Sequence, residues 1–200
     1  PYDDIDESDA PKVFVAGFGR VGQIIARVLN ARGVPFVALD ANPEQVDFVR
    51  RYGNKVYFGD VARFDLLRTA GVKDAEAFVC AISDREVSLK LAEHFCAEYP
   101  HVKFYARARD RTHAMALRER GAKVYMRDTL LSSLHVAEEL LLGLGFSRSD
   151  ARDTIAVFRK HDEDTLDKQY AVRDDDDAVV ATAKESIDQL KYLFDEDQRS

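Results

Sequence analysis

The chain contains few cysteines, no long apolar run and no excess of basic residues, and each of these features excludes a class of protein. Its two cysteines, Cys80 and Cys96, are expected to be buried thiols, as in proteins of a reducing cytosol. A membrane-spanning helix needs about 18 or more consecutive apolar residues, and no segment of the sequence has such a run. The net charge of −7 argues against a nucleic acid as partner.

The chain also lacks the residue patterns that catalysis requires. A dehydrogenase needs an acid or base beside the nicotinamide, and it usually has a substrate domain as well. The histidines are scattered without metal-ligand spacing, and no Ser-His-Asp or Cys-His motif is present. The sequence therefore predicts a regulatory domain rather than an enzyme, with no catalytic residue and no bound metal.

The most informative motif is a glycine-rich hexapeptide, which consists of Gly17, Phe18, Gly19, Arg20, Val21 and Gly22. It follows a short apolar run and opens an amphipathic stretch, which is the order of a dinucleotide-binding unit. The first glycine allows a tight turn, the second lets a pyrophosphate approach the backbone, and the third lets the helix lie close to the strand. The phosphates are expected at the N-terminus of the helix, where N–H groups are unpaired and the helix dipole is positive.

A second apolar run ends at Asp40, where a carboxylate is expected to take the two ribose hydroxyls of an adenosine. No arginine follows directly, since the next residues are Ala41, Asn42 and Pro43. A 2′-phosphate would meet a negative charge there. The site is therefore expected to hold AMP or NAD(H) rather than NADP(H).

Apolar runs and helical patterns alternate for about 115 residues. Strands are predicted at 12–16, 35–39, 55–58, 76–81, 102–106 and 123–126, and helices at 20–32, 43–52, 63–70, 84–98, 110–120 and 129–143. The pattern predicts the α/β class, with a Rossmann doubly wound parallel sheet of six strands in the order 3-2-1-4-5-6. We expect an acidic linker over 1–10, the nucleotide-binding domain over 11–145 and a helical C-terminal extension over 146–200.

Ligands of such sheets bind at the carboxyl ends of the strands, which places further residues near the nucleotide. These are Asp60, Val61, Ala62, Ala81, Ile82 and Arg107. Asp60 either flanks the adenosine or caps the helix at 63–70. Arg107 and Arg109 would lie on opposite sides of the strand end, one meeting phosphate and the other an acid such as Asp110, or both forming structural ion pairs.

The C-terminal extension contains an apolar stripe, which consists of Val180, Ala183, Ile187, Leu190 and Phe194. Leu166, Tyr170 and Arg173 extend the same register upstream. A stripe with this spacing needs a partner helix. It docks either on its own domain or on a second subunit.

Four segments together resemble a known family. They are residues 11–23, the run from Phe58 to Arg63, the run from Ala106 to Asp110, and the run from Val157 to His161. They are similar to the ligand-sensing domains, of the KTN or RCK class, of bacterial Kef potassium efflux systems.

The resemblance implies a regulatory domain at the cytoplasmic face of the bacterial inner membrane. It would act on a membrane-embedded potassium/proton antiporter module of the same polypeptide, as a homodimer with AMP or NAD(H) in the Rossmann cleft. Glutathione would hold the system closed, and glutathione S-conjugates of electrophiles would open it. Some members also bind a flavoprotein subunit that resembles quinone reductases.

The resemblance also implies a glutathione site between domains, with Arg27, Tyr52, Arg127 and Asp162 at the matching positions. Arginine suits the carboxylates of glutathione because its guanidinium binds carboxylate through two hydrogen bonds. Asp162 stands where the family often has asparagine, and an ionised aspartate accepts hydrogen bonds without donating them. A nucleotide-only sensor of another potassium transporter and a short NAD-dependent oxidoreductase are the alternative interpretations.

Overall fold

The computed structural model describes residues 12–43, 46 and 56–197. The chain divides into two compact units, Pro1–Asp128 and Thr129–Ser200, which are described separately below. Within the described residues, every helix is too short or too polar to cross a membrane. The predicted acidic linker over 1–10 and most of the helix predicted over 43–52 lie outside the described residues.

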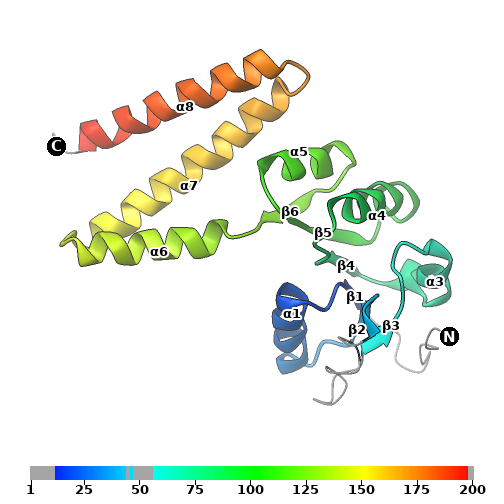
Figure 1. Cartoon of the computed structure of the whole chain (residues 1–200). Coiled ribbons are helices and arrows are strands. Elements are labelled where there is room, and N and C mark those ends of the chain that lie inside the picture. Colours follow the sequence, from blue (N-terminus) through cyan, green and yellow to red (C-terminus); the bar gives the residue numbers. More distant parts are fainter. Residues whose placement is uncertain (1–11, 44–45, 47–55, 198–200) are drawn as a thin grey trace. The chain divides into compact units, whose positions relative to one another are not determined.

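The first unit contains a parallel sheet of six strands in the order β3-β2-β1-β4-β5-β6 (Figure 1). The strands are β1 (Val13–Ala16), β2 (Phe36–Asp40), β3 (Val56–Phe58), β4 (Ala77–Cys80), β5 (Lys103–Ala108) and β6 (Val124–Arg127). The helices are α1 (Arg20–Ala31), α3 (Phe64–Thr69), η1 (Val72–Asp74), α4 (Arg85–Glu98) and α5 (Arg111–Glu119). This arrangement confirms the α/β Rossmann class with a parallel sheet.

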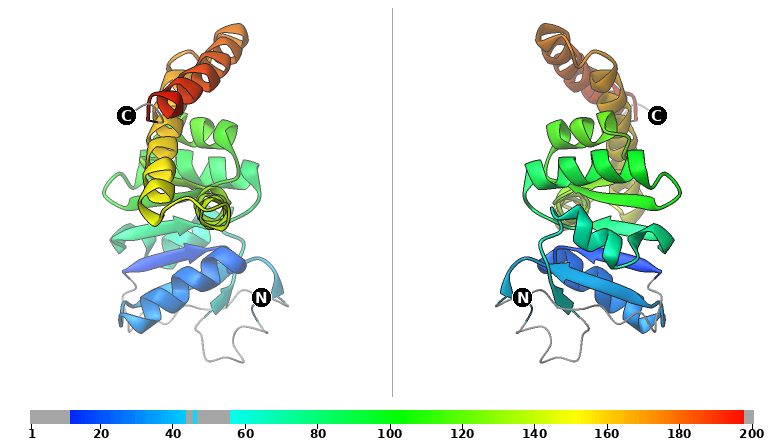
Figure 2. Two further views of the ribbon diagram at one scale, coloured as in Figure 1. Left: turned by 90° about the vertical axis from the view of Figure 1, so that its left-hand side faces the viewer. Right: turned by 90° about the vertical axis from the view of Figure 1, so that its right-hand side faces the viewer.

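Helices cover both faces of this sheet. Figures 1 and 2 show α1 on one face and α3, α4 and α5 on the other, as right-handed crossovers require when the strand order reverses between β1 and β4. The core between β4, β5 and α4 is aromatic: the ring of Phe78 lies 4.0 Å from that of Phe95 and 5.7 Å from that of Phe104, centroid to centroid. Because all strands are parallel, their carboxyl ends meet at one edge, where the predicted ligand residues lie.

The second unit consists of three helices, α6 (Leu130–Gly143), α7 (Arg148–Ala171) and α8 (Asp176–Asp197). The predicted helical C-terminal part is thereby confirmed. Ser147 caps α7 by accepting a hydrogen bond from the Asp150 N–H, at 3.1 Å. The nucleotide-binding domain predicted over 11–145 includes the segment of α6, whereas the contacts of α6 group it with the helical unit, because α6 packs on α7.

The apolar stripe predicted for the C-terminal extension is only partly buried. Leu166 and Tyr170 belong to α7, and the turn at 172–175 separates them from α8, so they do not continue its register. On α8, Leu190 is half-buried but Val180 and Ile187 are more than half exposed. The helix packs on α7 through a neighbouring face, where the hydroxyls of Ser186 and Thr165 lie 2.6 Å apart.

Candidate functional site

The glycine-rich loop lies between the ends of β2 and β4. Gly17 has a φ of +88°, which favours glycine, and a Cβ there would meet the Ile82 nitrogen at 3.0 Å and the Ala81 carbonyl carbon at 3.1 Å. The Gly17 N–H donates to the Leu39 carbonyl at 2.8 Å. The loop is therefore packed so tightly against its neighbours that it cannot hold a side chain at this position.

Gly22 and Gly19 meet very different surroundings. A Cβ on Gly22 would collide with the Gly17 carbonyl oxygen, so α1 crosses the loop at a distance that only glycine permits. A Cβ on Gly19 would have no atom of the described residues within 4 Å. Gly19 is also the N-cap of α1; no side chain of the described residues caps this helix end, and no acidic residue lies in its first turn. The N-terminus of α1 thus presents bare N–H groups beside open space, which suits an anion.

Asp40, at the end of β2, holds the glycine loop in place. Its Oδ2 accepts a hydrogen bond from the Phe18 N–H at 2.6 Å, and its Oδ1 accepts one from the Asn42 N–H at 2.8 Å. An ionised carboxylate has about four acceptor positions, so each oxygen can still accept one ribose hydroxyl. Sequence reasoning missed this second role because Asp40 and Phe18 lie 22 residues apart.

The prediction that Asp60 caps the following helix is wrong. Its Oδ1 accepts a hydrogen bond from the Ala62 N–H at 2.9 Å, within the turn that precedes α3, and the N-cap of α3 is Arg63, which makes no side-chain cap bond. Val61 in the same turn is buried. Asp84, by contrast, does cap α4, because its Oδ1 accepts from the Val87 N–H at 2.9 Å.

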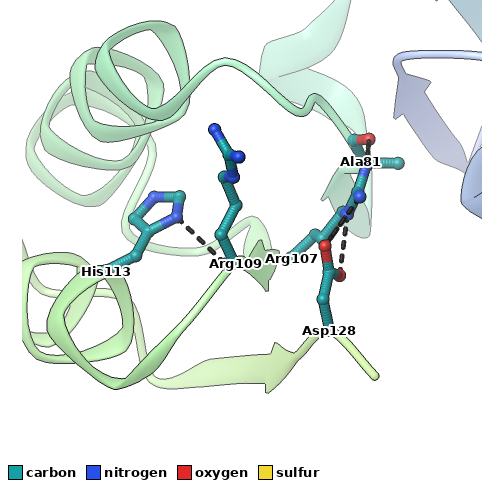
Figure 3. A network of polar contacts seen from close by, with 5 residues as sticks. All are labelled: Ala81, Arg107, Arg109, His113 and Asp128. Atoms are coloured by element: carbon teal, nitrogen blue, oxygen red, sulfur yellow. Dashed lines mark hydrogen bonds and ion pairs between the residues drawn. The ribbon is translucent and has the colours of Figure 1, made fainter. Parts of the chain in front are cut away.

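Arg107, at the end of β5, forms an ion pair with Asp128, which follows β6 (Figure 3). Its Nε lies 2.7 Å from each carboxylate oxygen, its Nη2 lies 2.6 Å from Oδ2, and its Nη1 lies 3.5 Å from the Ala81 carbonyl oxygen. The hydrogen bond with Asp128 raises the pKa of Arg107 above its usual value. The expected partner Asp110 instead caps α5, accepting from the His113 N–H at 2.7 Å.

A buried histidine, His113, connects the end of β5 with α4. Its Nδ1 accepts a hydrogen bond from the Arg109 N–H at 3.2 Å, and its Nε2 lies 2.8 Å from Ser88 Oγ, which donates to the Arg85 carbonyl at 3.0 Å. Burial, followed by the nearby Arg85 charge, lowers the pKa of His113. The neutral ring with its proton on Nε2 satisfies all these bonds. Sequence reasoning did not single out this residue.

The residues predicted for glutathione are spread over the chain. Arg27 is exposed on α1, Arg127 ends β6, and Asp162 is buried on α7 in the helical unit. Tyr52 lies outside the described residues. Within the first unit, β6 stands three strand positions from β1, about 14 Å at the usual strand spacing. One copy of the sheet therefore does not bring Arg27 and Arg127 together.

The two cysteines lie away from these residues. Cys80 is fully buried, and burial raises the pKa of its thiol to about 12. Cys96 borders a hollow of about 480 Å³ at the amino end of β5, together with Lys103, Tyr105 and Lys123. Burial raises the pKa of Cys96, against the opposing effect of Lys123. This hollow is at the opposite edge of the sheet from the glycine loop.

The tight glycine turn, the uncapped N-terminus of α1 and the carboxylate at the end of β2 define a Rossmann domain of the nucleotide-binding class. The TrkA-N domain model matches residues 13–127, and the model of the potassium efflux system KefB C-terminal domain matches residues 132–200. The chain belongs to the TrkA-N family and, within it, to the Kef regulatory domains of the KTN or RCK class. The homologues in this family, described below, are regulatory domains of a transporter and not enzymes.

Two curated relatives are glutathione-regulated potassium-efflux system proteins KefC. That of Klebsiella pneumoniae strain 342 is 39% identical over 197 residues, and that of Escherichia coli O157:H7 is 37% identical over 196 residues. Each alignment covers 98% of this chain and 32% of the relative. The chain thus spans about a third of the length of these relatives.

Two solved structures are similar as well. The Kef C-terminal domain of Shewanella denitrificans in its AMP-bound form is 38% identical, with a TM-score of 0.73 over 80% of this chain and 98% of that one. The TrkA-N domain of the Escherichia coli inner membrane protein ybaL is 22% identical, with a TM-score of 0.61 over 66% of this chain and 98% of that one. The second similarity concerns the fold alone.

Proposed function

We propose that this chain is the cytosolic ligand-sensing domain that gates a potassium/proton antiport module. In this proposal the module is membrane-embedded and part of the same polypeptide, and the domain lies at the cytoplasmic face of the bacterial inner membrane. Potassium efflux is inhibited by glutathione and activated by glutathione S-conjugates of electrophiles. The similarity to KefC over nearly the whole chain supports this function.

The nucleotide cleft is the part of this proposal that the geometry supports best. The observation that carries it is the open space at Gly19 beside the uncapped N-terminus of α1. AMP or NAD(H) binds there, with its phosphate on the α1 N–H groups and its ribose on Asp40. The AMP-bound form of the Shewanella denitrificans domain supports the adenine nucleotide.

Gly19→Ala should weaken AMP binding at least tenfold and lower the free energy of unfolding by no more than about 1 kcal/mol, because alanine is a poorer N-cap than glycine. A Cβ on Gly19 contacts no described residue, but it occupies the space through which a phosphate reaches the backbone. Calorimetric titration with AMP and thermal unfolding of the same samples measure both quantities. Gly143→Ala, at a helical glycine that also has open space around it, is the matched control. Wild-type affinity in Gly19→Ala would contradict the proposed position of the phosphate.

In the proposed glutathione site, one subunit contributes Arg27 and another contributes Arg127. Two subunits are needed because the strand order separates the two arginines within one sheet. The carboxylates of glutathione bind these guanidinium groups. Tyr52 yields to the substituent of an S-conjugate, and Asp162 accepts a hydrogen bond from the ligand.

Arg27→Ala and Arg127→Ala should each reduce glutathione affinity about tenfold, since each loses a charge-assisted hydrogen bond. Titrations with glutathione and with a bulky S-substituted glutathione, in the presence of AMP, test this expectation. Arg148→Ala, which removes an exposed arginine of α7, is the control. AMP binding without a response to either glutathione species would favour the alternative, a nucleotide-only sensor of another potassium transporter.

The proposed assembly is a homodimer in which the helical unit supplies contact surface. Val136 and Leu140 of α6 and its C-cap residue Leu144 are exposed, and they lie four residues apart and therefore on one face. Apolar residues in such a continuous stripe mark an interaction surface. A flavoprotein subunit that resembles quinone reductases is a further proposed partner, and nucleic acid is not.

A further inference from the structure

We propose that Arg109 selects nucleotides that carry a second phosphate group. This inference rests on the proposed nucleotide site and deepens it. Arg109 directly follows β5, so its backbone lies at the same edge of the sheet as the glycine loop and Asp40. Three features of the structure support the assignment: a held backbone, an unpaired guanidinium and the order of the strands.

The backbone of Arg109 is held by a chain of hydrogen bonds. Its N–H donates to His113 Nδ1 at 3.2 Å, and His113 Nε2 is anchored to Ser88 Oγ at 2.8 Å. Both His113 and Ser88 are fully buried, so α4 and α5 fix the point from which the Arg109 side chain starts. A group that is held before the ligand arrives loses less entropy on binding.

The guanidinium groups of Arg107 and Arg109 differ in their partners. That of Arg107 is occupied by Asp128 and directed at the Ala81 carbonyl. That of Arg109 makes no hydrogen bond or ion pair with the residues that the structure describes, and the side chain is exposed. Figure 3 shows its side chain running between the ring of His113 and the Arg107–Asp128 pair, with no dashed line to its guanidinium. The charge of Arg109 is therefore available to an anion.

The order of the strands indicates which anion this is. Asp40 ends β2 and the glycine loop follows β1, so a nucleotide places its ribose and then its first phosphate along the edge in the direction of β4. The next group of the ligand continues towards β5, which stands two strand positions from β1, about 10 Å away. A long arginine side chain from the end of β5 meets a second phosphate on this path rather than the first.

The test is calorimetric titration of the wild-type chain and of Arg109→Ala with adenosine, AMP and ADP. ADP affinity should fall about 10- to 100-fold in Arg109→Ala, because a charge-assisted bond to phosphate is lost. Affinity for adenosine and for AMP should change less than about threefold, as for a surface residue without a contact. Arg109→Lys should retain part of the ADP affinity, and Arg148→Ala is the control for the loss of one positive charge.

Three other results of these titrations would overturn the inference, and each points to a different cause. Equal losses for AMP and ADP would place Arg109 at the first phosphate, and unchanged binding of all three ligands would remove it from the site. A folded wild-type chain that binds neither AMP nor ADP would overturn the proposed nucleotide site itself, and the role of Arg109 with it.

Discussion

Gly22→Ala is expected to abolish AMP binding and to destabilise the first unit by about 2–4 kcal/mol. The added Cβ would overlap the Gly17 carbonyl oxygen, which is backbone and cannot rotate away. Either α1 or the loop must move, and Gly17 has little freedom to do so because it is wedged against Ile82 and Ala81. Denaturant unfolding measures the loss of stability, and titration measures the loss of binding.

Two other glycines make this expectation specific. Gly143→Ala should leave stability unchanged or raise it slightly, since alanine favours helix and the position has open space. Gly19→Ala should lose affinity with a stability loss of no more than about 1 kcal/mol at the N-cap, so only Gly22→Ala combines the loss of binding with a large loss of stability. Wild-type stability in Gly22→Ala would show that α1 does not cross the glycine loop as closely as the structure describes.

Leu140→Asp should convert the proposed homodimer into a monomer, with a dissociation constant raised at least 100-fold. Leu140 is 61% exposed, between Val136 at 67% and Leu144 at 69%. An aspartate at such a position costs little in a monomer, whereas a carboxylate buried between two subunits without a partner costs several kcal/mol. Sedimentation analysis over a range of protein concentrations measures the change.

Ile187→Asp is the matched comparison for Leu140→Asp. Ile187 is 57% exposed on α8 and belongs to the apolar stripe that the sequence showed. If α6 forms the interface, Ile187→Asp should leave the dimer intact. If Ile187→Asp dissociates the dimer and Leu140→Asp does not, the contact surface belongs to α8. Monomeric wild-type protein at high concentration would contradict the homodimer altogether.

Much of the first unit could be predicted from the sequence because the signals are local. The glycine-rich hexapeptide and the apolar runs on either side of it lie within about thirty residues of each other, as in a single strand-helix-strand unit. The cap of α4 is equally local, because Asp84 accepts from the Val87 N–H within one turn. Patterns of this kind depend on neighbours along the chain, which the sequence displays directly.

Contacts between distant residues could not be predicted in the same way. A structural ion pair was one of the alternatives for Arg107, and the structure contains it, but the sequence did not identify the partner, Asp128, which lies 21 residues further along the chain. The predicted continuation of the α8 register through Leu166 and Tyr170 is wrong, because the turn at 172–175 separates α7 from α8. For Arg107 the sequence offered several acidic residues as possible partners, and only the fold selects one of them.

The sequence by itself determined the class of fold, the glycine loop and the acid at the end of β2, because turn geometry and hydrophobic periodicity leave few alternatives. Only the tertiary structure decided which arginine is paired and which is available, that Asp40 also holds the loop, and that His113 is locked between Arg109 and Ser88. These roles depend on which strand ends become neighbours when the sheet assembles. The sequence shows the charge and the hydrogen-bonding groups of each residue, but the folded arrangement determines which residue it binds.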